Sequence, residues 1–269
     1  MSLLVILIVL MLLLIIGAPV MFAVGVAGFA YFIIAPNMWG SISIYAHKFF
    51  TGMDSFVFLC IPLFTLAGDL MGRSGMMNQL VKFSQLLVGR IRGGLGYVNV
   101  MVSMLFGGIS GSAMADVSAL GPVIIEMMKK DGYKTEFAAA ITATTAIQGP
   151  IIPPSIPMVI FASVTNVSVG ALFLGGAIPG VLIGIGQMLI IALMAKRRNF
   201  PCHYQKMNIH EASKVTVSAF WALLMPVIIL GGILFGIFTA TEAAAVAVGY
   251  AFVISTFVYK NMTFKGFME

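Results

Sequence analysis

The stretches FGGISGSAMADVSALGP, at residues 106–122, and ATTAIQGPIIPPSIP, at residues 143–157, decide the fold. Both are rich in glycine, proline and hydroxyl side chains, and both interrupt apolar sequence of membrane length. Irregular backbone in hydrocarbon leaves N–H and C=O groups without partners unless protein or a water-filled cavity receives them. Because the first stretch also holds Asp116, the only acid between Asp69 and Glu126, the two breaks predict an ion or substrate site at the ends of half-helices.

The composition indicates an integral membrane protein. Of the 269 residues, 60% are hydrophobic and only 9% are charged, whereas soluble domains carry about 25% charged residues. The apolar runs are continuous and show no β-barrel alternation, so we predict an all-α polytopic membrane protein with room for about seven or eight spans in the lipid bilayer. The net charge of +6 comes from Lys and Arg clusters between apolar runs, which is typical of cytoplasmic loops and not of nucleic-acid binding.

Residues 1–93 are predicted to form a scaffold. The apolar runs 3–16 and 20–35 flank a Gly-Ala-Pro turn, and we interpret the first run as a retained span, because it lacks the charged start of a signal peptide. Residues 39–53 mix aromatic and basic side chains, which suits a helix lying along the membrane interface. Residues 55–72 are predicted to form a third span.

The last part of this scaffold, residues 73–93, differs in its pattern. Apolar and small side chains recur there at helical spacing on one side, while basic residues occupy the rest, so we predict an amphipathic helix on the cytoplasmic surface. The alternative is a loop helix that only anchors the chain. The predicted apolar side consists of Met77, Leu80, Val81, Ser84, Leu87, Val88 and Ile91.

Residues 94–130 are predicted to form a re-entrant helical hairpin. Arg90 and Arg92 precede this segment and Lys129 and Lys130 end it, so the positive-inside rule places both ends in the cytoplasm. The break at the hairpin tip leaves halves of about 16–18 residues, which is marginal for a full crossing. A hairpin that enters and leaves by the same face satisfies both constraints, and two ordinary short spans are the alternative.

The hairpin is the first part of a predicted transport domain, residues 94–195. Residues 135–167 are predicted to cross the membrane as a broken helix, because two adjacent prolines remove N–H donors and clash with the preceding turn. A helix over 168–195 follows. A basic cytoplasmic loop, 196–215, then leads to further membrane helices in 216–269.

Three motifs in this order resemble one transporter family. They are GGISGSAMADVSALG (107–121), GPIIPPSIPM (149–158) and GIFTATEAAAVAV (236–248), and together they resemble the large membrane subunit of tripartite ATP-independent periplasmic (TRAP) transporters. The resemblance covers essentially the whole chain. It implies a sodium-driven importer of small organic acids, such as sialic acid or C4-dicarboxylates, in the bacterial inner membrane. It also implies two partners, a small membrane subunit and a periplasmic substrate-binding protein.

The resemblance further implies an elevator-type architecture in which two hairpins and two broken helices come from inverted repeats. Residues 1–269 hold one hairpin and one broken helix, and no second copy of the hairpin motif is found there. We therefore expect the partner pair, and any substrate contacts it makes, to lie outside these residues. Na⁺ is the expected coupling ion, and no organic cofactor is expected.

Asp116 is the main candidate for sodium binding, since a carboxylate at membrane depth needs a cation or hydrogen-bond donors. The alternative is that Asp116 caps the second hairpin helix. Ser110 and Ser112 flank Gly111 and offer hydroxyl groups and freed carbonyls, although small residues also serve close helix packing. By this resemblance, the residues of the hairpin tip match the family's sodium site, and the break of the second helix supplies carbonyls that face it. The predicted sodium-binding residues are Ser110, Gly111, Ser112, Ala113, Asp116, Gly149 and Pro150.

A substrate carboxylate is predicted at the start of the second half-helix, which Pro153, Pro154 and Ser155 open. The N–H groups and the positive dipole end of a helix N-terminus favour an anion. The alternative is a proline kink without a ligand. Asn166 is included in the predicted substrate site, and Thr142 and Thr165 could line the same polar pathway, but such side chains also serve as interhelical hydrogen-bond partners.

Other functions have less support. An intramembrane hydrolase needs a Ser–His pair, paired aspartates or HExxH, and the sequence has none of these, so we do not expect an enzyme. The histidines, His47, His203 and His210, lie in loop-like stretches. Glu242 is expected to cap a helix start. A non-transporting scaffold subunit and another elevator-type di- or tricarboxylate transporter are the alternatives, and ATP-driven transport is disfavoured because no Walker A pattern occurs.

Overall fold

A computed structural model describes residues 2–34, 42–198, 200–201 and 209–259. Within these ranges the regular structure is helical and no β-strand occurs, which confirms the all-α prediction. Four of the described helices are long and apolar enough to cross a membrane, and four more apolar helices are shorter. The protein is therefore a polytopic membrane protein, with fewer full-length spans in the described ranges than the seven or eight that composition alone accommodates. The chain divides into two compact units, Met1–Ser55 and Phe56–Glu269.

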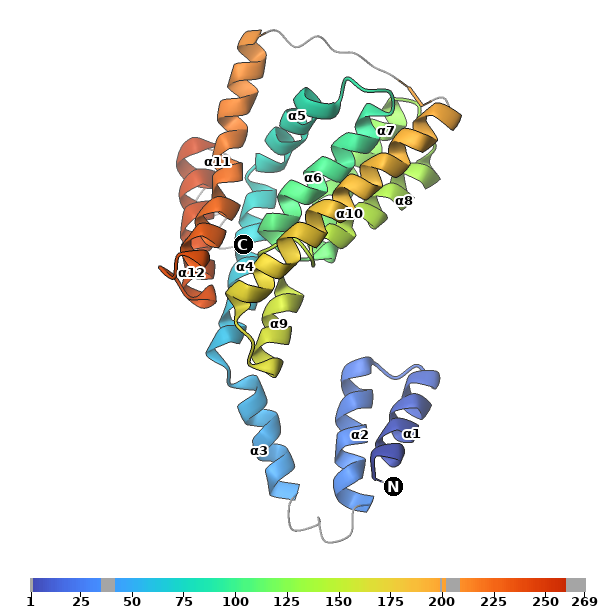
Figure 1. Cartoon of the computed structure of the whole chain (residues 1–269), viewed down its shortest axis with the longest axis vertical. Helices are drawn as coiled ribbons and strands as arrows, with labels where there is room; N and C mark the ends of the chain where they lie inside the picture. The colour runs from blue at the N-terminus through green and yellow to red at the C-terminus, as the bar shows by residue number, and fades with distance from the viewer. Residues whose placement is uncertain (1, 35–41, 199, 202–208, 260–269) are drawn as a thin grey trace. The chain divides into compact units, whose positions relative to one another are not determined.

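The first unit is a pair of apolar helices followed by a third helix. Helices α1 (Ser2–Ile15) and α2 (Val20–Ile34) pack against each other across a turn in which Gly17 has φ +86° (Figure 1). Helix α3 (Ile42–Met53) contacts α2 through Tyr45, whose hydroxyl donates to a main-chain carbonyl of α2 at 2.7 Å. The helices predicted here are confirmed, and the interfacial position of α3 stays a prediction.

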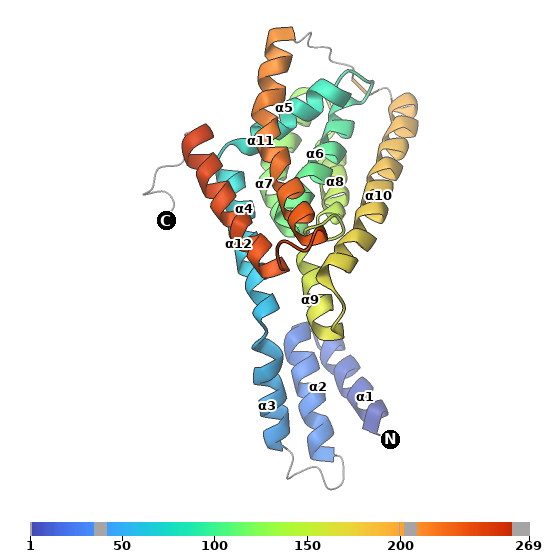
Figure 2. The ribbon, with the colours of Figure 1, turned by 60° about the vertical axis from the view of Figure 1, so that its left-hand side comes forward.

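The second unit is a bundle that contains both breaks. Its elements are η2 (Phe56–Leu59), α4 (Cys60–Arg73), α5 (Met76–Val88), α6 (Gly94–Ser110), α7 (Ala113–Lys130), α8 (Thr135–Thr145), η3 (Ala146–Gln148), α9 (Ile156–Thr165), α10 (Val169–Arg197), α11 (Ile209–Leu234), α12 (Ala240–Val253) and η4 (Ile254–Val258). Helix α12 runs along α4 (Figure 2), and α11 contacts α5. The single-span helix predicted over 55–72 corresponds to η2 and α4. The proposed division at residue 93 stays a prediction.

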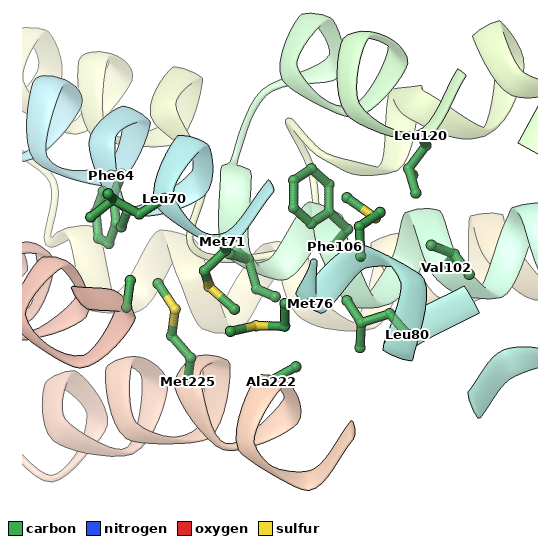
Figure 3. Packing of buried hydrophobic residues seen from close by; sticks show 14 of the residues in the cluster. Phe64, Leu70, Met71, Met76, Leu80, Val102, Phe106, Leu120, Ala222 and Met225 are labelled. Carbon is green, nitrogen blue, oxygen red and sulfur yellow. The ribbon is translucent and has the colours of Figure 1, made fainter. Parts of the chain in front are cut away.

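Helix α5 confirms the predicted amphipathic helix, but its apolar side contacts protein. Met76, Met77, Leu80 and Val81 are buried in the core, and α5 packs against α6 and α11. Figure 3 shows Met76 and Leu80 among buried side chains that include Phe106 of α6 and Met225 of α11. Two members of the predicted side are half exposed: Leu87, in the last turn of the helix, and Ile91, beyond its end at Val88.

Helices α6 and α7 form an antiparallel helical hairpin. Asn99, near the start of α6, contacts Met128, near the end of α7, with Nδ2 and Sδ 4.0 Å apart. At the open end, the Gly93 N–H donates to the Pro201 carbonyl, and the rings of Tyr133 and Phe200 lie 5.1 Å apart. The sequence predicts a break over residues 107–112, which is too long: α6 stays helical through the glycine pair Gly107 and Gly108 to Ser110, and only residues 111–112 interrupt the helices.

The second break separates α8 and η3 from α9, as the prolines predicted. Helix α10 follows and lies along this broken helix, because its glycines permit close approach. Gly176 and Gly180 face Ile151 and Ile152 of the break, where an added Cβ would overlap those residues. The broken helix predicted over 135–167 is therefore confirmed as a local structure.

The predicted loop at 196–215 is wrong at both ends. Helix α10 continues to Arg197 and α11 begins at Ile209. Three of the residues that follow Ile209, namely Glu211, Ala212 and Lys214, are good helix formers, and Glu211 lies in the first turn, where a carboxylate interacts favourably with the helix dipole. Two of the histidines assigned to loops also lie in helices, His47 in α3 and His210 in α11, while His203 lies outside the described residues.

Candidate functional site

The hairpin tip contacts the break of the second helix through main-chain atoms. Gly111 ends α6 with φ +61°, and its carbonyl accepts a hydrogen bond from the Ile156 N–H at 3.3 Å. A Cβ on Gly111 would lie 2.6 Å from the Pro154 carbonyl oxygen, and one on Gly107 would lie 2.9 Å from the Cα of Gly149. Glycine is therefore required at these crossings, because any side chain would separate the two breaks.

Asp116 lies at this contact and is completely buried, with 0% of its surface exposed. Its Oδ1 accepts a hydrogen bond from the Ser110 hydroxyl at 2.5 Å. Its Oδ2 has no hydrogen-bond partner among the residues that the structure describes. A Cβ on Gly149 would lie 2.9 Å from this Oδ2 and 3.3 Å from the Ser112 carbonyl oxygen, so the missing side chain leaves space beside both oxygens.

The structure decides against Asp116 as the cap of the second hairpin helix. Ser112 is the N-cap, and its Oγ accepts from the Ala115 N–H at 3.4 Å. Asp116 lies one residue beyond that N–H, inside the helix, and its carboxylate is held by Ser110 instead. Capping therefore does not account for the buried carboxylate.

The groups around Asp116 suit a hard monovalent cation. A buried carboxylate oxygen without a partner is costly, and a cation removes that cost. The possible metal ligands around it are oxygens, namely the Ser110 hydroxyl and the Ser112 carbonyl. Ala113 begins α7 at the same tip. Hard cations prefer such oxygen ligands. The set is consistent with Na⁺, with Asp116 supplying the single charge.

Pro150 and Ser155 are hydrogen-bonded to each other across the break. The Ser155 hydroxyl donates to the Pro150 carbonyl at 2.5 Å, and its Oγ accepts from the Met158 N–H at 3.3 Å as the N-cap of α9. Gly149 contacts the hairpin tip directly, whereas the Pro150 carbonyl already has one donor. The tip and Gly149 are therefore brought together as predicted, and Pro150 lies next to them.

The predicted substrate residues are only partly brought together. Pro153, Pro154 and Ser155 are buried at the break, but the N–H groups of the first turn of α9 already have partners: Ile156 donates to Gly111, and Met158 and Val159 donate to Ser155. Proline at the second position has no N–H. The substrate role of this turn stays a prediction, and its donors are occupied in this conformation.

Asn166 lies apart from the other predicted substrate residues. It is exposed, has φ +56° and ends α9 at the opposite end from Ser155. The ten residues of α9 place the two ends about 15 Å apart. Thr165 bonds only to the Phe161 carbonyl of its own helix, at 2.7 Å, so neither residue joins the buried carboxylate.

Several buried polar side chains were not assigned to the site from sequence. Asn99 donates to the Thr142 hydroxyl at 2.7 Å, and Ser103 donates to the Thr145 hydroxyl at 3.1 Å, which links α6 to α8. Thr142 is thus an interhelical partner, as one of the sequence alternatives held. Gln148, directly before Gly149, is also fully buried and hydrogen-bonded to another helix. An amide next to a Gly-Pro break in apolar sequence was the signal that could have identified it.

Glu242 is structural, as expected. It forms a capping box with Thr239, in which the Thr239 N–H donates to Oε2 at 2.8 Å and the Thr239 Oγ1 accepts from the Glu242 N–H at 3.3 Å. This reciprocal pair satisfies two N–H groups at the start of α12. Glu242 is exposed, so it does not compete with Asp116 as a buried acid.

A hairpin tip that meets a broken helix at a buried carboxylate is an arrangement typical of membrane transport proteins, whose sites lie at half-helix ends. The chain belongs to the family described as the DctM component of the tripartite ATP-independent periplasmic transporter, whose model matches residues 7–269. The relatives that the chain matches are permeases and not enzymes, and the family places the chain in the bacterial inner membrane.

Named relatives support this assignment. The chain is 44% identical over 253 residues to the sialic acid TRAP transporter large permease protein SiaM of Vibrio cholerae, covering 94% of this chain and 58% of that protein. It is 42% identical to the 2,3-diketo-L-gulonate TRAP transporter large permease protein YiaN of Escherichia coli, covering 83% and 52%. It is 39% identical to the C4-dicarboxylate TRAP transporter large permease protein DctM of V. cholerae, covering 92% and 54%. The chain thus spans about half the length of the curated relatives it matches.

Proposed function

We propose that this chain acts in a sodium-driven secondary importer of small organic acids, of the sialic acid or C4-dicarboxylate type. The relatives named for these substrates support the substrate class. The observation that carries the sodium coupling is the buried Oδ2 of Asp116, which has no partner at the contact between the hairpin tip and the broken helix. The proposed partners are a small membrane subunit and a periplasmic protein that delivers the substrate.

In this proposal, Na⁺ binding stabilises the ionised carboxylate of Asp116 at the hairpin tip. A bound Na⁺ supplies the positive charge that lets a carboxylate remain ionised in a low-dielectric environment. Ser110 holds the carboxylate through Oδ1, so that Oδ2 faces the space beside Gly149. Because the tip also bonds to Ile156, closing the tip around the ion orders the start of α9.

The proposed path of the hairpin is re-entrant, and the proposed movement is of the elevator type. Both ends of the hairpin meet Phe200, after the end of α10, and this shared end carries Arg92 and Lys130. The positive-inside rule places such an end in the cytoplasm. The tip then lies at membrane depth, and the hairpin, broken helix and α10 would move together against the remaining helices.

The test is Na⁺-dependent uptake by the full-length chain with its small membrane subunit and binding protein in proteoliposomes. Asp116→Asn keeps the shape and removes the charge, so uptake is expected to lose its dependence on a Na⁺ gradient. Asp69→Asn is the matched control, because Asp69 is 53% exposed and paired with Arg73 at 2.9 Å. Sodium-dependent uptake that survives in Asp116→Asn at the level of Asp69→Asn would refute the assignment.

A further inference from the structure

Two side-chain amides tie the end of α8 to α10. The Gln187 Nε2 donates to the Thr144 carbonyl at 3.0 Å, and the Gln148 Nε2 donates to the Gln187 Oε1. Thr144 lies in the last turn of α8, where helical carbonyls run out of backbone partners. Gln187 therefore supplies a donor to the helix end just before the break.

The orientation of both amides follows from the Thr144 carbonyl, which can only accept. The Gln187 atom that faces it must be the nitrogen, so the Gln187 oxygen faces Gln148. Gln148 must then present its own nitrogen, which directs its Oε1 away from Gln187. Within the described part of the chain this Oε1 has no hydrogen-bond partner, and Gln148 is 0% exposed.

The main chain of Gln148 is part of the site. Its carbonyl accepts from the N–H groups of Ile151 and Ile152 at 3.0 and 2.7 Å, and these bonds start the break. The next residue is Gly149, whose Cα borders the space beside the Oδ2 of Asp116. A side chain held by α10 thus fixes the residue that faces the carboxylate.

We propose that Gln187 is a positioning residue that acts through Gln148. It holds Gly149 at the distance from Asp116 at which the tip binds Na⁺, and it sets the affinity for the ion without touching it. This inference rests on the proposed sodium coupling.

Packing alone gives no reason for this pair. A buried acceptor without a partner destabilises the fold, and replacing hydrogen-bonded partners by apolar groups of the same shape is often neutral or stabilising. Methionine matches the length of glutamine, and Gln187→Met removes both bonds of the relay that runs from Thr144 through Gln187 to Gln148. Each single substitution leaves the other amide without its partner and is expected to lower the unfolding midpoint, whereas the double variant Gln148→Met/Gln187→Met is expected to keep the stability of the Na⁺-free protein. All three variants are expected to weaken Na⁺ binding.

The experiment is a Na⁺ titration of the purified full-length chain in detergent. The thermal unfolding midpoint is measured at each Na⁺ concentration, and choline chloride keeps the ionic strength constant. Loss of the relay is expected to raise the apparent Kd for Na⁺ about three- to tenfold. The double variant is expected to match the single variants, because the two residues act in one chain. Either single variant carries the test if the other does not fold.

Asn99→Leu is the matched control. This substitution removes another buried amide that bonds to α8, since the Asn99 Nδ2 donates to the Thr142 hydroxyl at 2.7 Å. Asn99 lies eleven residues before Ser110, about 16 Å along the helix. The substitution is expected to lower the unfolding midpoint and leave the Kd for Na⁺ unchanged. A merely structural relay would give this same pattern for Gln187→Met.

The outcomes separate the two proposals. A Na⁺ response that persists in Asp116→Asn overturns the proposed ion site itself. If Asp116→Asn loses the response while Gln187→Met binds Na⁺ as the parent does, the ion site stands and the positioning role is wrong. Additive effects of the two methionine substitutions would also overturn it, because they would show that Gln187 does not act through Gln148.

Discussion

Gly149→Ala tests the contact between the two breaks most directly. The new Cβ would lie 2.9 Å from the Asp116 Oδ2 and 3.2 Å from the Ser112 carbonyl carbon, closer than ordinary van der Waals contact. Overpacking of this kind costs about 1–3 kcal/mol. Gly149 has φ −54°, which alanine adopts readily. Replacing glycine by alanine therefore lowers the conformational entropy of the unfolded chain and stabilises the protein by about 0.4–1 kcal/mol. The net expected loss of stability is about 1–2 kcal/mol.

The effect on ion binding is expected to be larger than the effect on folding, because the methyl group fills the space beside Oδ2. A ligand at one hundred times its Kd stabilises a protein by about 2.7 kcal/mol, and Gly149→Ala is expected to lose most of that increment. The assay is thermal unfolding of the full-length protein with and without saturating Na⁺. Gly186→Ala is the control, since nothing lies within 4 Å of the added Cβ. A full Na⁺ increment in Gly149→Ala would refute the proposed location of the ion.

Three further substitutions probe other contacts. Ser110→Ala removes the donor to the Oδ1 of Asp116, and the unpaired acceptor is expected to cost about 1–3 kcal/mol in thermal unfolding; an unchanged midpoint would contradict that bond. Thr239→Ala breaks the capping box with Glu242 and is expected to cost about 0.5–2 kcal/mol, while Na⁺-dependent uptake stays normal. Asp69→Asn removes an ion pair whose Asp69 side chain is 53% exposed, so its effect on unfolding is expected to stay below about 1 kcal/mol, and a larger loss would mean that the pair is shielded from solvent.

The two breaks were predictable because their causes are local. Adjacent prolines cannot continue a helix, and the glycines of the first stretch weaken one. The length of the first break was not predictable, since packing of Gly107 against Gly149 keeps α6 helical through the glycine pair. The basic stretch before α11 was misassigned for a related reason: charge indicates the side of the membrane but does not decide where a helix ends.

The roles of single polar residues were also predictable only where their partners are close in sequence. Thr239 and Glu242 lie three residues apart, so the sequence alone predicted their capping interaction. For Asp116 the sequence left sodium binding and helix capping open, and the structure excludes capping, because Ser112 caps α7 and Ser110 on the other hairpin helix holds the Asp116 carboxylate. Asn166 shows the reverse error, because a polar residue near the break in sequence lies at the far end of α9 in space.

The sequence by itself determined the class of protein, the two helix breaks and the buried acid between them, since hydrophobicity, proline geometry and the cost of a charge in hydrocarbon act on short stretches. Only the tertiary structure decided which atoms meet. Gly149 lies beside Asp116, and Gln187 lies thirty-nine residues from Gln148 in sequence and bonds to it through space. Such contacts depend on how whole helices pack, and no local pattern of residues encodes the distance between them.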